Sequence, residues 1–253
     1  MARITPLLTA MHRYDKSLST WGRGKGTVIE APVLAWLVET RQGRLLYDVG
    51  CDWKKLGDAR RFEGFVFGPP RMTPEQRLPA LLQRLKLSVL DVDLVVVSHL
   101  HFDHAGGLAD VAHAEVHVQR AEREAARSGL DPACFADEVN APCRWKETVG
   151  GYSPLEGVTV IPSPGHTAGH VSLLIERDAG APVVLCGDAA DLEENLVDEV
   201  APGLCWRDDP APALASIRAL KATARDVGAE LWPNHDLAFY TRLQRGAVPH
   251  RLP

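Results

Sequence analysis

Three histidines and an aspartate fall within six residues of this chain, directly after an apolar run. The run is residues 94–97 (LVVV), and the segment that follows it reads HLHFDHAGG from His99 onward. Three imidazoles and a carboxylate packed this closely are unfavourable unless a metal ion or paired hydrogen bonds offset their charges. Imidazole and carboxylate groups without nearby sulfur are typical ligands of catalytic zinc and related divalent ions. The segment therefore predicts a metal site.

Three more candidate ligands each follow a later predicted strand. His166 stands in PGHTAGH, Asp188 in CGD and His235 in NHD. Polar groups at strand ends can converge on one edge of a sheet, where open α/β sheets tend to bind ligands. We therefore expect these side chains and the HLHFDH segment to meet at one site.

The remaining pattern predicts sheets in both halves of the chain, with helices between and after them. Predicted strands are residues 32–40 and 44–49 (a hairpin), 94–98, 115–119, 158–161, 171–176, 183–186 and 229–232. Predicted helices are residues 73–87, 120–127 and 210–227. Residues 128–155, with three prolines, are expected to form a loop-rich insertion. The pattern predicts a layered α/β or α+β fold in one domain spanning residues 1–253.

Composition narrows the function classes. The 253 residues are 45% hydrophobic and 24% charged, as in ordinary globular proteins, with a net charge of −5. This acidic balance argues against a nucleic-acid partner. No apolar run approaches the roughly 20 residues that span a bilayer, and no export signal is recognised. Five scattered cysteines fit a reducing compartment, so we expect a cytoplasmic protein; whether it forms a homodimer is left open.

The segments HLHFDHAGG, PGHTAGH, CGD and NHD, in this order, resemble the metallo-β-lactamase superfamily with its HxHxDH signature. The resemblance runs from the predicted hairpin to His235. It implies an αββα sandwich of class α+β, with two mixed β-sheets packed face to face and helices on the outer faces. Within the superfamily the chain looks most like the N-acyl-homoserine lactonases and 4-pyridoxolactonase. Those enzymes hydrolyse lactone rings with a dinuclear zinc centre.

The resemblance also implies a role for each candidate residue. Two divalent metal ions, Zn²⁺, would be the cofactors and a small lactone the substrate. The first ion would be bound by His99, His101 and His166, the second by Asp103, His104 and His235, with Asp188 bridging them. By analogy, Asp103 would also carry a proton to the leaving alkoxide.

One position departs from the family pattern. Members of the lactonase group usually carry a tyrosine three residues after the bridging aspartate, where its hydroxyl can donate a hydrogen bond to the substrate carbonyl. Here that position is Asp191, and an ionised carboxylate only accepts hydrogen bonds. Tyr152 or a metal ion acting as a Lewis acid would then have to replace it.

Two other functions remain open on the same fold. A thioesterase of the glyoxalase II kind uses the same ligand set, and a binding protein without turnover could keep the fold. The complete ligand set favours an enzyme over the binding protein. A serine hydrolase is disfavoured because no G-x-S-x-G motif is present.

Several residues are given supporting or ordinary roles. His170 and Asp48 are predicted to support the ligands through hydrogen bonds. Gly106 and Gly107 are predicted to let the backbone pass close to the metal ions. Four histidines are interpreted as ordinary surface or strand residues: His12, His113, His117 and His250. Aromatic residues that could line a substrate pocket are Trp21, Trp53, Phe65 and Phe67.

Overall fold

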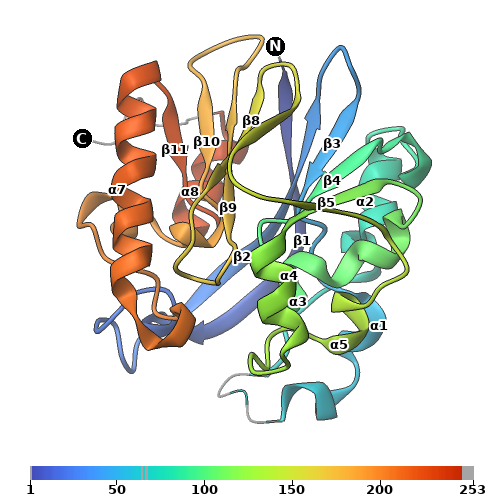
Figure 1. Cartoon of the computed structure of the whole chain (residues 1–253). Coiled ribbons are helices and arrows are strands. Elements are labelled where there is room, and N and C mark those ends of the chain that lie inside the picture. The colour runs from blue at the N-terminus through green and yellow to red at the C-terminus, as the bar shows by residue number, and fades with distance from the viewer. Residues whose placement is uncertain (1, 64, 66–67, 247–253) are drawn as a thin grey trace. The chain divides into compact units, whose positions relative to one another are not determined.

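The computed structural model describes residues 2–63, 65 and 68–246 (Figure 1). Phe67 and His250 lie outside the described residues. The chain divides into two compact units. We call residues 4–13 and 32–149 the six-stranded unit, and residues 1–3, 14–31 and 150–253 the five-stranded unit, after the sheet that each contains.

The six-stranded sheet has the strand order β1-β2-β3-β4-β5-β6. Its strands are β1 (Arg3–Asp15), β2 (Val28–Glu39), β3 (Arg44–Tyr47), β4 (Leu94–Val96), β5 (Glu115–Gln119) and β6 (Arg144–Thr148). The predicted hairpin is confirmed, because β2 and β3 pair antiparallel with Trp36 opposite Tyr47 and Glu39 opposite Arg44. From β3 to β6 the strands run parallel. All three residues of β4 are buried, as expected for a central parallel strand covered on both faces.

Five α-helices accompany this sheet. They are α1 (Trp53–Leu56), α2 (Leu78–Arg84), α3 (Phe102–Ala105), α4 (Arg120–Arg127) and α5 (Ala136–Val139). The predicted helix 120–127 is confirmed by α4. One hydrophobic core of the unit gathers side chains from the sheet and from α2, among them Leu37, Val95, Val116 and Leu82.

Strand β1 was not predicted from the sequence. Its thirteen residues, RITPLLTAMHRYD, include Pro6 and lack a clean alternation of apolar and polar side chains. Proline cannot donate a ladder hydrogen bond and is therefore confined to edge strands or strand ends. β1 stands at the edge of its sheet, which explains why the structure tolerates Pro6 there.

The predicted helix 73–87 is wrong as one continuous element. A short 3-10 helix covers Pro74–Gln76, Arg77 is extended with ψ of 140°, and α2 ends at Arg84. A helix that began at Thr73 would place Pro79 in its interior, where the ring clashes with the carbonyl four residues earlier. Breaking the helix at Arg77 moves Pro79 into the first turn of α2, where a proline is accommodated.

The expected loop-rich insertion at residues 128–155 is also corrected. It contains α5, strand β6 and strand β7 (Tyr152–Leu155). β6 extends the sheet by pairing parallel with β5, with Glu115 opposite Arg144. Pro154 lies in β7, which is an edge strand of the other sheet, so its missing N–H does not interrupt a central ladder.

The five-stranded unit contains a mixed sheet of order β11-β10-β9-β8-β7. Besides β7 its elements are β8 (Val158–Pro162), β9 (Val171–Ile175), β10 (Val183–Leu185), α6 (Glu193–Val197), α7 (Pro210–Val227), β11 (Glu230–Trp232) and α8 (Leu237–Gln244). β10 pairs antiparallel with β9 and parallel with β11. Strands β8 to β11 fall where the sequence predicted them, whereas β7 was not predicted.

Helix α7 has the predicted bounds because its ends are encoded locally. The Asp209 carboxylate accepts a hydrogen bond from the Ala211 N–H, Pro210 opens the first turn, and Gly228 ends the helix with φ of +69°. Ile217 and Leu220 of this helix pack with Val184 of β10 in one core (Figure 1). The helix thus covers the strands that lead into two of the candidate ligands.

Both sheets are mixed and both units carry helices, which confirms the α+β class. Within the part of the chain that the structure describes, no helix is both long and apolar enough to cross a bilayer.

Candidate metal centre

The HLHFDH segment follows the end of β4 and runs into α3; we call residues 97–104 the motif loop. Hydrogen bonds from three directions fix its backbone. The Val97 N–H donates to the His117 carbonyl at 3.1 Å, and the His104 carbonyl accepts from the Val49 N–H at 2.9 Å. The Leu100 N–H donates to Oε1 of Glu122 on α4 at 2.9 Å. The backbone that carries these imidazoles is therefore hydrogen-bonded to β5, to the segment after β3 and to α4.

A hydrogen-bond relay from Asp48 sets the tautomers of two histidines in the motif loop. Oδ2 of Asp48 accepts from Nδ1 of His104 at 2.8 Å and from Oγ of Ser98 at 2.9 Å. Because the Ser98 hydroxyl donates to Asp48, its oxygen accepts the hydrogen bond from Nδ1 of His99 at 2.9 Å. Both rings then carry their proton on Nδ1, and Nε2 keeps the lone pair that a metal ion requires. The predicted supporting role of Asp48 fits this geometry.

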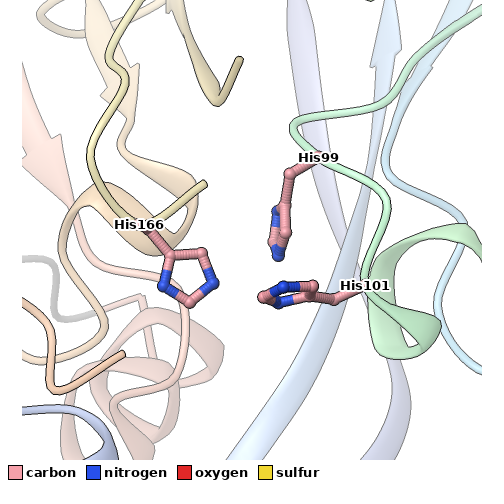
Figure 2. Close-up of side chains that lie close together, drawn as sticks. All are labelled: His99, His101 and His166. Carbon is pink, nitrogen blue, oxygen red and sulfur yellow. The ribbon is translucent and has the colours of Figure 1, made fainter. Parts of the chain in front are cut away.

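The carboxylate of Asp131 orients His101, and in this ring the proton lies on Nε2 and not on Nδ1. Its Nε2 donates to Oδ2 of Asp131 at 3.0 Å, which leaves the lone pair on Nδ1. The ring lies edge-on to that of His99 with 4.4 Å between centroids, and Figure 2 shows the two rings beside each other. Asp103 follows in the same loop, with its Oδ1 3.8 Å from Nε2 of His104. The six-stranded unit thus brings all four motif side chains together.

Burial and nearby charges shift the pKa values of Asp48 and His101. Burial raises the pKa of Asp48, although the nearby His104 and the hydrogen bonds from Ser98 oppose that change. Burial alone would lower the pKa of His101, but the hydrogen bond and charge of Asp131, with the charge of Asp103, raise it overall. The carboxylates around His101 therefore favour a positive charge at this position.

Gly106 and Gly107 allow a close approach between two segments of the chain. A Cβ at Gly106 would lie 2.4 Å from the backbone nitrogen of Asp52, and one at Gly107 would lie 2.4 Å from the carbonyl oxygen of Val49. Only glycine permits this approach. Glycine is therefore required here by the contact with residues 49–52 of the chain; that this backbone also passes close to the metal ions stays a prediction.

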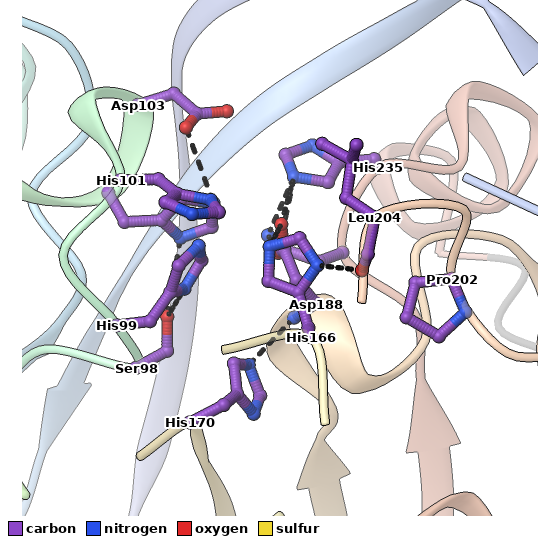
Figure 3. A network of polar contacts seen from close by, with 12 residues as sticks. Ser98, His99, His101, Asp103, His166, His170, Asp188, Pro202, Leu204 and His235 are labelled. Atoms are coloured by element: carbon purple, nitrogen blue, oxygen red, sulfur yellow. Dashed lines mark hydrogen bonds and ion pairs between the residues drawn. The ribbon is translucent and has the colours of Figure 1, made fainter. Parts of the chain in front are cut away.

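In the five-stranded unit, His166 follows β8. Its Nδ1 donates to the Leu204 carbonyl at 3.0 Å, so its lone pair lies on Nε2 (Figures 2 and 3). The neighbouring backbone is fixed by a hydrogen bond from the Trp206 N–H to the Gly165 carbonyl at 2.8 Å. His166 is thus the fourth candidate ligand whose tautomer is set by a defined acceptor.

Asp188 lies in a 3-10 turn, Gly187–Ala189, directly after β10, and contacts two candidate ligands. Its Oδ1 is 3.2 Å from Nε2 of His235, and its Oδ2 is 3.5 Å from Nε2 of His166. Nδ2 of Asn234 donates to Oδ1 at 3.0 Å. The five-stranded unit therefore brings its three predicted ligands together around one carboxylate (Figure 3).

His170 supports Asp188 through the backbone. Its Nε2 accepts from the Asp188 N–H at 2.9 Å, and its Nδ1 contacts Oγ of Ser163 at 2.9 Å (Figure 3). Since Nε2 is already used as an acceptor, His170 positions the loop of Asp188 and is not itself a ligand. This agrees with its predicted role.

The other histidines outside this region are also satisfied locally. Nε2 of His12 contacts the Gly68 carbonyl, Nε2 of His113 contacts the Val92 carbonyl, and Nε2 of His117 lies 2.7 Å from Oε1 of Glu115. These contacts fit the interpretation of the three side chains as ordinary surface or strand residues.

Sequence reasoning missed the partners that fix the ligands. Asp131 follows His101 by thirty residues and Glu122 belongs to a charged helix, so neither had a local signal. Asn234 could have been noticed, because it directly precedes His235 in the sequence. The structure shows that it is buried. Ser98 likewise adjoins the motif and connects Asp48 to His99.

The chain is similar to known proteins over most of its length. The model of the metallo-beta-lactamase superfamily matches residues 28–235. N-acyl homoserine lactonase AiiA of Bacillus thuringiensis subsp. kurstaki is 36% identical over 217 residues, 84% of each chain. N-acyl homoserine lactonase AttM of Azorhizobium caulinodans is 29% identical over 229 residues, 85% of each chain.

One solved structure is an N-acyl homoserine lactone hydrolase with the product N-hexanoyl-L-homoserine bound at its catalytic metal center. It superimposes with a TM-score of 0.84 and 32% identity, covering 95% of this chain and 94% of the other. With a family model that spans most of its length and relatives that match it almost end to end, this chain belongs to the metallo-beta-lactamase superfamily.

Proposed function

We propose that this protein is a dinuclear metal-dependent hydrolase that opens the lactone ring of N-acyl homoserine lactones. One observation carries the proposal: in His99, His101, His104 and His166 a ring nitrogen is held by a fixed partner, so the other nitrogen can bind a metal ion. The lactonases to which the chain is similar supply the substrate class. A solved structure that is 30% identical to this chain is described as a quorum-quenching N-acyl homoserine lactone lactonase.

We propose that the ligand residues of both units bind one pair of divalent ions, zinc in the first instance. One ion is assigned to His99, His101 and His166, the other to Asp103, His104 and His235, with Asp188 bridging. The donor set of imidazole nitrogens and carboxylate oxygens suits catalytic zinc. Each unit carries only part of this set, which supports a single hydrolase domain built from both.

The bound ions supply a Lewis acid for the ester carbonyl and lower the pKa of water. The residues of the chain prepare the site for that chemistry. Asp48 and Ser98 hold two imidazoles in one tautomer, so the ligands need no rearrangement when substrate arrives. We assign proton transfer to Asp103: its carboxylate would take a proton from the water that adds to the carbonyl carbon, and would deliver that proton to the alkoxide that leaves when the ring C–O bond breaks.

The cytoplasm is the proposed compartment. All five cysteines lie in the described part of the chain and are free thiols. Burial raises the pKa of Cys186 to about 12, which keeps this thiol protonated and unreactive. Unpaired cysteines of this kind fit a reducing environment.

A hydrolysis panel tests the function. N-hexanoyl- and N-decanoyl-homoserine lactone, an aromatic lactone and a hydroxyacyl-glutathione thioester are each incubated with zinc-loaded protein. Ring opening or thiol release is followed by mass spectrometry. We expect turnover of the acyl homoserine lactones and loss of that turnover in His101→Ala. Hydrolysis of the thioester alone would instead favour the glyoxalase II-like alternative, and no turnover in the zinc-loaded protein would favour a binding protein.

A further inference from the structure

A third carboxylate lies beside the candidate ligands of the five-stranded unit. Asp191 is buried, with only 4% of its surface exposed. One ligand atom from each of Asp188, Asp191 and His235 can be chosen so that all lie within 4.8 Å of one another. No role in the proposed reaction has been given to Asp191 so far.

Backbone hydrogen bonds hold Asp191 in this place. The His235 N–H donates to the Asp191 carbonyl at 2.8 Å, and the Asn234 N–H donates to the Ala190 carbonyl at 3.1 Å. The loops after β10 and β11 are thereby tied together. The backbones of Asp191 and His235 are therefore held next to each other by the fold.

A buried aspartate just before a helix often caps that helix, but other side chains serve the first N–H groups of α6. The Leu192 N–H donates to Oδ1 of Asn195 at 2.7 Å, and the Glu193 N–H donates to Oδ2 of Asp236 at 3.0 Å. Helix capping at these two groups therefore does not account for the buried carboxylate of Asp191.

A cation would stabilise the group formed by Asp188, Asp191 and His235. Two buried carboxylates this close repel each other when both are ionised, and burial penalises each charge. The thiol of Cys205 is used elsewhere, because its Sγ donates to the Pro202 carbonyl at 3.2 Å. A metal ion held by carboxylate oxygens and an imidazole offsets both charges.

We infer that Asp191 is an eighth metal ligand, which binds the ion shared by Asp188 and His235. The inference rests on the proposed function, because it uses the same metal centre. It assigns a role to a residue that stands out in the sequence only as a departure from the family pattern. A further carboxylate also makes the ligand set richer in oxygen, and carboxylate oxygens suit Mn²⁺ better than imidazole nitrogens do.

Metal binding to purified full-length protein tests the inference without an activity assay. Wild type, Asp191→Asn and Asp191→Ser are stripped with a chelator and titrated with Zn²⁺ or Mn²⁺ against a metal indicator. We expect two ions per wild-type chain and, in both variants, an affinity for one ion that falls at least roughly tenfold. The loss should be larger for Mn²⁺ than for Zn²⁺, which a purely structural role would not produce.

Asp198→Asn is the matched control. It removes the same charge from the same unit, at an ion pair between Oδ2 of Asp198 and Nη1 of Arg23 in which both side chains are about half exposed. Its affinities should equal those of wild type. Unchanged affinities in both Asp191 variants, with lactone hydrolysis intact, would overturn this inference alone. A wild-type chain that binds no metal would overturn the proposed function together with it.

Discussion

At the scale of single residues, Asp48 has the largest influence on the motif loop. It has no exposed surface, and one carboxylate accepts from the Ser98 backbone N–H at 2.6 Å, the Ser98 hydroxyl and His104. Through Ser98 it also acts on His99. One buried anion thus sets the orientation of two imidazoles, in the way that carboxylates commonly support metal-binding histidines.

Replacing Asp48 should therefore weaken metal binding without removing a ligand. In Asp48→Asn, the amide NH₂ can face Nδ1 of His104 and compete for the wrong tautomer. We expect zinc affinity to fall about 10- to 100-fold, measured by competition with a chromophoric chelator. The exposed Asp226→Asn on α7 is the control. Wild-type affinity in Asp48→Asn would contradict the relay.

The candidate ligands could be selected from the sequence because His99, His166, Asp188 and His235 each come soon after a predicted strand. His99, His101 and His104 lie within one short segment, and the spacing alone indicates a metal site. The partners Asp131 and Leu204 were not predictable, since each contacts its histidine across thirty or more residues. Long-range partners depend on how elements pack, which a single sequence does not state.

At the scale of elements, helix α4 anchors the motif loop. Glu122 points into the protein with 1% of its surface exposed, and its Oε1 accepts from the Leu100 N–H. In Glu122→Ala that N–H loses a buried acceptor, at a cost of about 1–3 kcal/mol. We expect the unfolding temperature to fall by roughly 3–10 °C, measured by calorimetry.

Two variants on the same helix control this prediction. Glu122→Gln keeps an oxygen acceptor for the Leu100 N–H and should recover most of the loss. Glu124→Ala changes an exposed side chain two residues away and should leave the unfolding temperature nearly unchanged. Equal losses in Glu122→Ala and Glu124→Ala would show that the contact with Leu100 does not stabilise the fold.

Helix α5 makes stability depend on pH. Burial raises the pKa of Glu138 to about 7, although the ion pair with Lys55 at 2.9 Å opposes the shift. Because the folded chain holds this proton more tightly than the unfolded chain, the group's stabilising contribution is complete below about pH 4.5. It is lost as the pH rises to about 7, by about 3 kcal/mol.

Glu138→Gln should remove this contribution. Denaturant unfolding between pH 5 and 8 should show a smaller fall of the free energy of unfolding with rising pH in the variant than in wild type. The exposed Glu124→Gln serves as the control. Parallel curves for Glu138→Gln and wild type would contradict the raised pKa.

The elements also show where local sequence is sufficient. The bounds of α7 were predicted because Asp209, Pro210 and Gly228 encode both ends. Strand β1 was missed because a proline fits a strand only at a sheet edge, and the sequence does not show which strand lies at the edge. The break at Arg77 was missed because the prediction included the proline that follows it in one continuous helix. Strand β6 was missed because it forms by pairing with β5, a long-range contact that its own sequence does not indicate.

At the scale of the whole molecule, the two compact units are interleaved in sequence. Residues 14–31 belong to the five-stranded unit, although they lie between two segments of the six-stranded unit. No composition shift marks these crossings, so the division could not be read from the chain. The proposed ligands are divided the same way, four in the six-stranded unit and three in the five-stranded unit.

The account depends on these two ligand sets binding the same ions. A crystal structure of the zinc-loaded protein, with anomalous diffraction at the zinc edge, tests this directly. We predict two zinc peaks about 3.5–4 Å apart, bound by His99, His101, Asp103 and His104 together with His166, Asp188 and His235. Zinc bound by one unit alone, or two ions at separate places, would contradict it.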